Sequence, residues 1–249
     1  MNERMNTNIP ITKETIKRLV NDIKQITKNP LTENGIYYHH DTEDMLKGYA
    51  MIVGPEDTPY FGGFYFFIFN FSRDYPYSPP EIVYCTNSNK IRFNPNLYVN
   101  GKVCISILNT HPSGDKWSAC QNITSILLSL LTLFTKDPLL NEPGINKMDS
   151  DLIGYTESIR FANFNYALCD VVMKSPNVYN MDFFNLFETD VMTHFVKNYE
   201  TILGLIKDNL KNNRLNNTSV STRIYRMDVR INYEMVLEKY EGIRSLTII

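Results

Sequence analysis

Residues 35–85 carry the pattern that decides the fold, and they read GIYYHHDTEDMLKGYAMIVGPEDTPYFGGFYFFIFNFSRDYPYSPPEIVYC. Four strand-like segments, at residues 35–38, 45–53, 64–71 and 81–85, alternate with turns rich in Asp, Gly and Pro. Because these turns are short, they favour an antiparallel meander over a parallel sheet, which needs long crossovers. The third segment is aromatic on both faces. We expect one face to pack on helices and the other to be core, with a partner surface as the alternative.

Helical patterns lie on both sides of the strands. A first amphipathic helix is predicted between a cap at Thr12 and a stop at Asn29-Pro30. Its apolar face consists of Ile16, Leu19, Val20, Ile23 and Ile26. Ser118 and Gln121 have the spacing of a capping box, so a second helix is expected to begin there and continue to about residue 134. A third helix is predicted over about residues 150–173.

A break at Ser175-Pro176-Asn177 marks the start of a C-terminal extension. Apolar residues at helical spacing predict a long amphipathic helix over residues 184–210 and a final helix over residues 230–246. Residues 211–222 are polar and Asn-rich, which is typical of a flexible linker. The apolar helix faces need burial, either on the rest of the chain or on a partner.

The composition excludes several classes of protein. The 249 residues are 43% hydrophobic, which is enough for a core, and a net charge of −2 gives no footprint for nucleic acid or an acidic membrane. The first ten residues hold no apolar signal core, and the most apolar run, residues 123–134, is too short to span a bilayer. The four histidines show no ligand spacing, so we expect no metal.

The four cysteines form no C-x-x-C pair, so a reducing compartment is expected, with the cytoplasm as the location and the nucleus as a second one. Cys85 and Cys169 lie in apolar runs and Cys120 begins a predicted helix, so we interpret these three as structural. Cys104 instead lies in residues 92–108, RFNPNLYVNGKVCISIL, which lack helix or strand periodicity. A loop of that length in a compact domain suggests function.

Four segments in order carry a resemblance to a known family. They are GPEDTPYFGG at residues 54–63, YPYSPP at 75–80, the Cys104 segment, and Trp117-Ser118. Together they resemble the ubiquitin-conjugating enzymes over residues 12–173. The resemblance implies an α+β fold with an N-terminal helix, a four-stranded antiparallel meander and C-terminal helices. We therefore divide the chain into a catalytic core, residues 10–175, and a helical extension, residues 176–249.

The resemblance implies an acyltransferase that works through a cysteine thioester. An activating enzyme would use ATP to charge ubiquitin, or a ubiquitin-like modifier, and Cys104 would accept it. A lysine amine of a protein substrate, usually brought by a ubiquitin ligase, would then attack the thioester. We expect no cofactor on this chain, because ATP is used by the activating enzyme, and no nucleic-acid or membrane partner.

The same resemblance implies roles for residues around Cys104. Asn96, eight positions earlier, would support the oxyanion or order the loop through its amide donors. Asn94 stands where the family usually has His and would support the loop. Glu142, in the turn after the next helix, is our candidate to position or deprotonate the lysine, with a solvated turn carboxylate as the alternative. Ser106 stands where many relatives carry Asp, which would alter acceptor preference.

Two partner surfaces also follow from the resemblance. Tyr77 and the Ser118-Ala119 turn match loops that contact ligases, although Ala119 replaces a usual Pro. Lys17 and Arg18 match the basic helix face that the activating enzyme contacts. The long segment over residues 108–117 and the extension resemble a larger branch of the family. One member of that branch works with a second activating enzyme and accepts more than one modifier.

Two other classes of function stay open on the sequence. A catalytically silent binding module would scaffold ubiquitin or a ligase, and the altered Asn94 and Ala119 are compatible with it. An unrelated thiol enzyme is disfavoured because no paired His motif or C-x-x-C is present. Thioester formation on Cys104 distinguishes conjugation from both.

Overall fold

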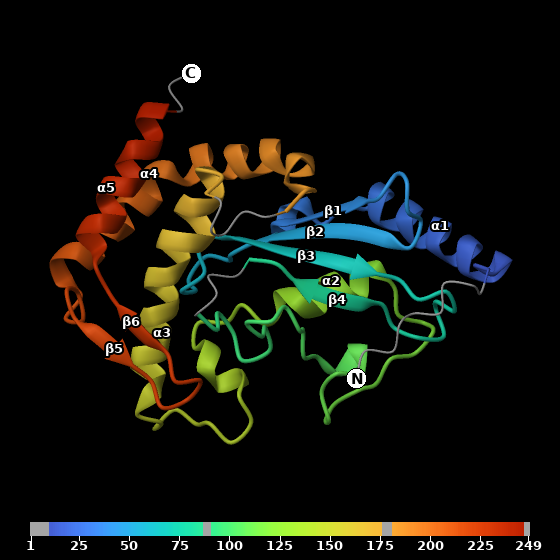
Figure 1. Ribbon diagram of the computed structural model, residues 1–249, viewed down its shortest axis with the longest axis horizontal. Helices are drawn as coiled ribbons and strands as arrows, with labels where there is room; N and C mark the ends of the chain where they lie inside the picture. The colour runs from blue at the N-terminus through green and yellow to red at the C-terminus, as the bar shows by residue number, and fades with distance from the viewer. Residues whose placement is uncertain (1–9, 87–90, 176–180, 247–249) are drawn as a thin grey trace.

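The structure is a computed structural model that describes residues 10–86, 91–175 and 181–246 (Figure 1). An N-terminal helix comes first, and a four-stranded sheet follows it. The rest of the chain forms helices and a small hairpin. The longer elements are α1 (Lys13–Lys28), β1 (Ile36–His40), β2 (Lys47–Val53), β3 (Phe64–Asn70), β4 (Glu81–Tyr84), α2 (Ile123–Leu131), α3 (Asp151–Ala162), α4 (Glu188–Asn212), β5 (Ser219–Ser221), β6 (Asp228–Arg230) and α5 (Tyr233–Leu246). The predicted break at residues 175–177 extends into residues outside those described.

The sheet is the predicted antiparallel meander, with strand order β1-β2-β3-β4. Met51 pairs with Phe66 and Ile52 with Tyr65, so alternate residues of β3 point to opposite faces. The inner face holds Tyr65, Phe67 and Phe69, all fully buried. The Tyr65 ring lies 4.7 Å from that of Phe134, just after α2, and its hydroxyl donates to Asn163 at 2.6 Å. The helices around α2 and α3 therefore cover this face.

The outer face of the sheet is covered by the chain's own C-terminal extension. Tyr49 stacks on Phe183 at 4.5 Å, and the ring of Phe66 lies 5.7 Å from that of Phe187. Tyr37 Oη lies 2.7 Å from Nε2 of His194 in α4. Figure 1 shows α4 across this side of the sheet, opposite α2. The prediction that both aromatic faces are core is confirmed, and the extension docks on the core.

The first helix is confirmed, but its buried face differs from the one predicted. Thr12 caps α1 by accepting from the Thr15 amide. The buried positions are Thr15, Leu19, Asp22 and Ile26, whereas Ile16 is 37% exposed. Asp22 is buried because it accepts hydrogen bonds from Arg18 and from the Tyr75 hydroxyl, which offset the cost of removing a charge from water.

The starts of α2 and of the third helix are set by local hydrogen bonds. The capping-box prediction at Ser118 and Gln121 is wrong, because these residues close a turn, and the capping box is formed by Asn122 and Ser125. The third helix begins at Asp151 as α3 and continues as a π-helical segment, Asn163–Asp170. The predicted span of residues 150–173 is therefore helical, with a change of helix type inside it.

The prediction of a flexible linker at residues 211–222 is wrong. The Asn213 side chain donates to Glu157 at 2.6 Å, and that of Asn216 accepts from the Tyr233 amide at 3.0 Å. Residues 219–221 then pair with β6, with the side chains of Val220 and Val229 buried. The asparagines thus satisfy the backbone of an ordered connection, and the extension holds a hairpin between its helices.

Candidate active site around Cys104

The segment that carries Cys104 is an ordered loop tied to the edge of β4. Isolated bridges join Lys102 to Val83 and Val103 to Leu97. Gly101 has φ +88°, and a Cβ there would lie 3.0 Å from Val83 Cγ1 and 3.1 Å from the Tyr84 carbonyl. Only glycine therefore fits where the loop turns back along β4. The irregular, ordered loop expected from the sequence is confirmed.

The Cys104 thiol is largely buried. The side chain is 9% exposed, and Sγ donates a hydrogen bond to the Thr110 carbonyl at 3.2 Å. Burial raises the pKa of the thiol, the positive charges of Lys102 and Arg92 lower it, and the negative charge of Glu142 raises it. The net shift of the thiol pKa is upward, so the two cations offset only part of the effect of burial, which disfavours the nucleophilic thiolate.

The other three cysteines have different surroundings. Burial raises the pKa of both Cys85 and Cys169 to about 12, which keeps these thiols protonated in the core. Cys120 is exposed and lies in the turn before α2, so it does not begin a helix as predicted. The placement of Cys85 and Cys169 agrees with structural roles.

Asn96 faces Cys104 directly. Its Nδ2 donates to the Cys104 carbonyl at 2.6 Å, and its own carbonyl accepts from the Cys104 amide at 2.8 Å. This pair of hydrogen bonds fixes the backbone of the cysteine. Nδ2 carries two hydrogens, and this contact uses one of them. The Asn96 side-chain amide is therefore held against the backbone of Cys104.

Asn94 is fully buried and joins the loop to the rest of the core. Its Nδ2 donates to the Leu133 carbonyl at 2.8 Å and to the Tyr60 hydroxyl at 3.1 Å. Its Oδ1 accepts from the Asn96 amide at 2.9 Å. Asn94 thus occupies the place of loop support that the sequence suggested, and it acts on Cys104 through Asn96.

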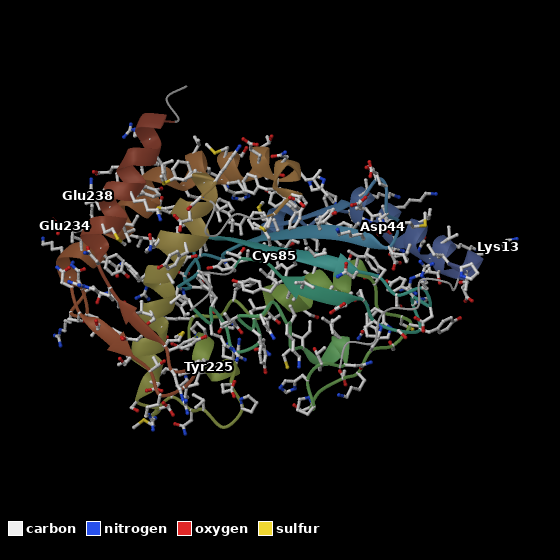
Figure 2. All side chains as sticks on the ribbon, viewed as in Figure 1. Lys13, Asp44, Cys85, Tyr225, Glu234 and Glu238 are labelled. Carbon is white, nitrogen blue, oxygen red and sulfur yellow. The ribbon has the colours of Figure 1, made fainter. Side chains whose placement is uncertain are left out.

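Glu142 lies near the thiol but is not a free solvated carboxylate. It follows a short 3-10 helix, Pro138–Asn141, and its Oε2 accepts a short hydrogen bond from the Tyr225 hydroxyl. Tyr225 belongs to the loop between β5 and β6. Figure 2 shows it beside the lower end of α3, far from Glu234 on α5. The C-terminal extension therefore reaches the active-site loop.

Arg92, Tyr98 and Tyr225 are site residues that the sequence did not single out. The Arg92 guanidinium carbon lies 3.6 Å from the centre of the Tyr98 ring and 4.2 Å from that of Tyr225, so the cation sits between two aromatic rings. Arg92 and Tyr98 are in the quoted loop, where only their proximity to Cys104 could have pointed to them. Tyr225 is 83 positions from Glu142, and no sequence signal joins the two.

The long segment after Cys104 folds back beside Ser106. Thr110 Oγ1 accepts from the Ile105 amide and donates to the Ile105 carbonyl, both at 3.0 Å. Gly114 lies so close that a Cβ on it would be 2.9 Å from Ser106 Oγ. Ser106 itself is half-buried at the start of a 3-10 helix, Ser106–Leu108. This segment therefore forms one wall of the site and supplies the acceptor for the thiol.

The predicted ligase-facing residues come together on neighbouring loops. The Trp117 indole donates to the Pro76 carbonyl at 2.7 Å and so joins the Tyr77 loop to the Ser118-Ala119 turn. Tyr77 is 64% exposed, and its hydroxyl donates to Glu14 of α1 at 2.6 Å. Ser118 is exposed as well.

The two α1 residues predicted to face an activating enzyme, Lys17 and Arg18, differ in how far their side chains are held by other residues. Lys17 is exposed. The Arg18 guanidinium donates to the Asp22 carboxylate at 2.9 Å, to the Ala119 carbonyl at 2.5 Å and to the Gln121 carbonyl. Arg18 therefore fastens α1 to the Ser118-Ala119 turn, and its contact with an activating enzyme stays a prediction.

Neither a membrane span nor a metal cluster is found in the parts of the chain that the structure describes. No helix there is long and apolar enough to cross a bilayer. Likewise, within residues 10–86, 91–175 and 181–246, no three His, Cys, Asp or Glu side chains are grouped so that they could hold a metal ion.

An α+β core with a cysteine loop ordered by two asparagines is the architecture of a ubiquitin-conjugating enzyme. The family model described as "Ubiquitin-conjugating enzyme" matches residues 18–157, more than half of the chain. The chain therefore belongs to the ubiquitin-conjugating enzyme family.

Individual relatives agree with this assignment. The chain is 43% identical over 162 residues to ubiquitin-conjugating enzyme E2 Z of Homo sapiens, covering 64% of this chain and 45% of the relative. It is 36% identical over 179 residues to probable ubiquitin-conjugating enzyme protein 17 of Caenorhabditis elegans, covering 66% of this chain and 24% of the relative. It is 35% identical over 161 residues to the dual E2 ubiquitin-conjugating enzyme/E3 ubiquitin-protein ligase BIRC6 of Homo sapiens, covering 59% of this chain and 3% of the relative. The match spans less than half the length of each of these relatives.

Proposed function

We propose that this chain accepts ubiquitin, or a ubiquitin-like modifier, as a thioester on Cys104 and transfers it to a lysine amine. The observation that carries the proposal is the mutual hydrogen bonding of Asn96 and Cys104, anchored by buried Asn94. This arrangement holds a thiol and an amide donor on one rigid loop, as acyl transfer requires. Family membership supports the same reaction.

In the loading step, the Cys104 thiolate attacks the carbonyl carbon of a modifier held as a thioester on the activating enzyme. A new C–S bond forms on Cys104, and the sulfur of the activating enzyme leaves as a thiolate. The incoming acyl group is already activated, because ATP was consumed by the partner. Because the acyl group arrives activated, no dedicated histidine base is required, and Lys102 and Arg92 offset part of the rise in the thiol pKa that burial causes.

In the discharge step, the lysine nitrogen attacks the carbonyl carbon of the Cys104 thioester. An oxyanion develops, and the remaining Nδ2 hydrogen of Asn96, whose amide also donates to the Cys104 carbonyl, would support that charge. Glu142 positions the amine and takes its proton. The C–S bond then breaks, an isopeptide bond remains, and Cys104 is released as a thiolate.

The partner surfaces belong to the same proposal. Tyr77, Ser118 and Ala119 would face a ligase, because the Trp117 hydrogen bond holds their loops together. Lys17, exposed on α1, and Arg18 beside it would face the activating enzyme. Ser106 beside the cysteine would influence acceptor choice, and no cofactor is needed on this chain. We place the reaction in the cytoplasm, with the nucleus as a second location.

A charging assay tests the function. The full chain is mixed with ubiquitin, ATP and an activating enzyme, and the products are separated without reductant. A reductant-sensitive adduct is expected with the native chain and with Cys120→Ser, a control that removes an exposed cysteine. Cys104→Ala should form no adduct, and Cys104→Ser should form an ester that resists thiol reductants. Absence of an adduct with every activating enzyme and modifier would favour a non-catalytic binding module.

A further inference from the structure

The loop between β5 and β6 brings Tyr225 from the C-terminal extension to the cysteine site. Its hydroxyl donates to one oxygen of Glu142, and its ring covers one face of the Arg92 guanidinium at 4.2 Å. Its ring also lies 6.0 Å from that of Tyr155, whose hydroxyl donates to the Arg92 carbonyl at 2.6 Å. Tyr225 therefore contacts two charged residues that both influence the Cys104 thiol.

The position of Tyr225 is fixed by its neighbours. The Ile224 amide donates to Asp151 Oδ2 at 2.9 Å, and the Thr222 amide donates to the Met227 carbonyl at 2.9 Å. Tyr225 and Arg226 have φ values of +63° and +51°, which L residues seldom adopt. Two successive residues in this conformation persist only where the surroundings over-determine them, and such strain is common at functional sites.

The hydrogen bond leaves Glu142 with a defined orientation. Within the described residues, Tyr225 is the side chain that hydrogen-bonds to the Glu142 carboxylate. Its hydroxyl donates to Oε2 of Glu142. Oε1 is then available to a second donor. A carboxylate held by one oxygen loses less freedom when its other oxygen meets an incoming ammonium group.

We propose that Tyr225 is a positioning residue for the discharge step: it holds Glu142 so that Oε1 receives the proton of the attacking lysine. This inference rests on the proposed function. In the step, the ammonium N–H bond breaks, its proton moves to Oε1, and the freed electron pair forms the C–N bond to the thioester carbonyl carbon. The C–S bond breaks and the sulfur leaves as a thiolate, while the nitrogen loses its second proton to solvent as the amide forms. Glu142 then releases the first proton to solvent.

The test is a single-turnover discharge assay with Tyr225→Phe in the full chain. This variant keeps the ring over Arg92 and removes only the hydroxyl. The chain is charged with ubiquitin, charging is stopped by removing Mg²⁺, and loss of the thioester is followed after addition of free lysine. We expect loading to be unchanged and discharge to lysine to fall about tenfold, the effect of a lost hydrogen bond to a charged group.

Two further readouts separate positioning from general support of the fold. Hydroxylamine reacts as a neutral amine near neutral pH, so its discharge rate should not change in Tyr225→Phe. In a Glu142→Gln background, Tyr225→Phe should cause no further loss, because the carboxylate that it positions is gone. Tyr49→Phe is the matched control, since it removes a tyrosine hydrogen bond of 2.6 Å to the Asp41 carboxylate outside the site. It should behave as the native chain.

The outcomes distinguish this inference from the function on which it rests. If the native chain forms no thioester, the proposed function is wrong and the inference with it. If the native chain is charged normally but Tyr225→Phe discharges to lysine at the native rate, the positioning role alone is wrong. Equal slowing toward lysine and hydroxylamine, or an undiminished effect in the Glu142→Gln background, would also overturn it and indicate a structural role.

Discussion

Replacing Asn94 with Ala should destabilise the protein by about 3 kcal/mol, because this fully buried side chain makes three hydrogen bonds. At about 0.5–1.5 kcal/mol each, their loss costs about 1.5–4.5 kcal/mol. The Leu133 carbonyl keeps a second donor, Asn141 Nδ2 at 3.0 Å, which reduces the cost. The Asn96 amide keeps no such replacement among the contacts of the described residues, which offsets that reduction and leaves the expected cost at about 3 kcal/mol.

The assay is urea unfolding of the native chain, Asn94→Ala and the control Asn212→Ala. Asn212 is exposed at the end of α4 and bonds only Asp208 among the described residues, so its replacement should cost less than about 0.5 kcal/mol. Asn94→Ala should lower the denaturation midpoint without changing the slope. It should also slow discharge, because Asn96 loses the contact that places it beside Cys104. A loss of stability below about 1 kcal/mol would refute the assignment of Asn94 as the anchor of the loop.

Three further outcomes are expected. Asn96→Ala should slow transfer to lysine by about 2.7–4 kcal/mol of activation energy and loading by less; single-turnover rates check this, and equal losses in both steps would contradict it. Lys102→Ala should move the rise of the Cys104 loading rate to higher pH, because Lys102 lowers the pKa of the thiol. Burial lowers the pKa of His39 and His194 below 6.5, so the unfolded chain binds more protons just below that pH and stability should fall on acidification. Melting temperatures between about pH 7.5 and 5.5 test it, and His39→Gln should flatten the dependence.

The sheet could be predicted because its sequence signal is local. Strands β2 and β3 are long, strongly apolar and joined by a turn rich in Gly and Pro, so pattern and turn chemistry agree. The existence of α1 was equally clear, but its buried face was not. Buried Asp22 depends on Arg18 and on Tyr75, which lies 53 positions away, and apolar periodicity carries no information about such a partner.

The central residues of the candidate site could be predicted because they lie in one contiguous loop. Asn94, Asn96 and Cys104 are close in sequence, so their spacing and the family resemblance placed them together. Tyr225 could not be found this way. It lies between two three-residue strands, just after the Asn-rich residues 211–222, whose polar composition was mistaken for flexibility. The asparagine side chains there bond to backbone groups, an ordering role that composition alone does not distinguish from solvation.

Because the extension packs on the sheet and reaches the cysteine site, its removal should affect both stability and transfer to lysine. Deletion of residues 176–249 leaves Cys104, Asn94 and Asn96 in the chain. In the structure this deletion uncovers Tyr49 and Phe66, and each large aromatic side chain returned to water costs about 1.5–3 kcal/mol. It also removes Tyr225 from Glu142 and Arg92. A truncated chain should therefore be less stable and discharge lysine slowly even where it still loads. The point substitution Tyr225→Phe is needed to separate these two effects.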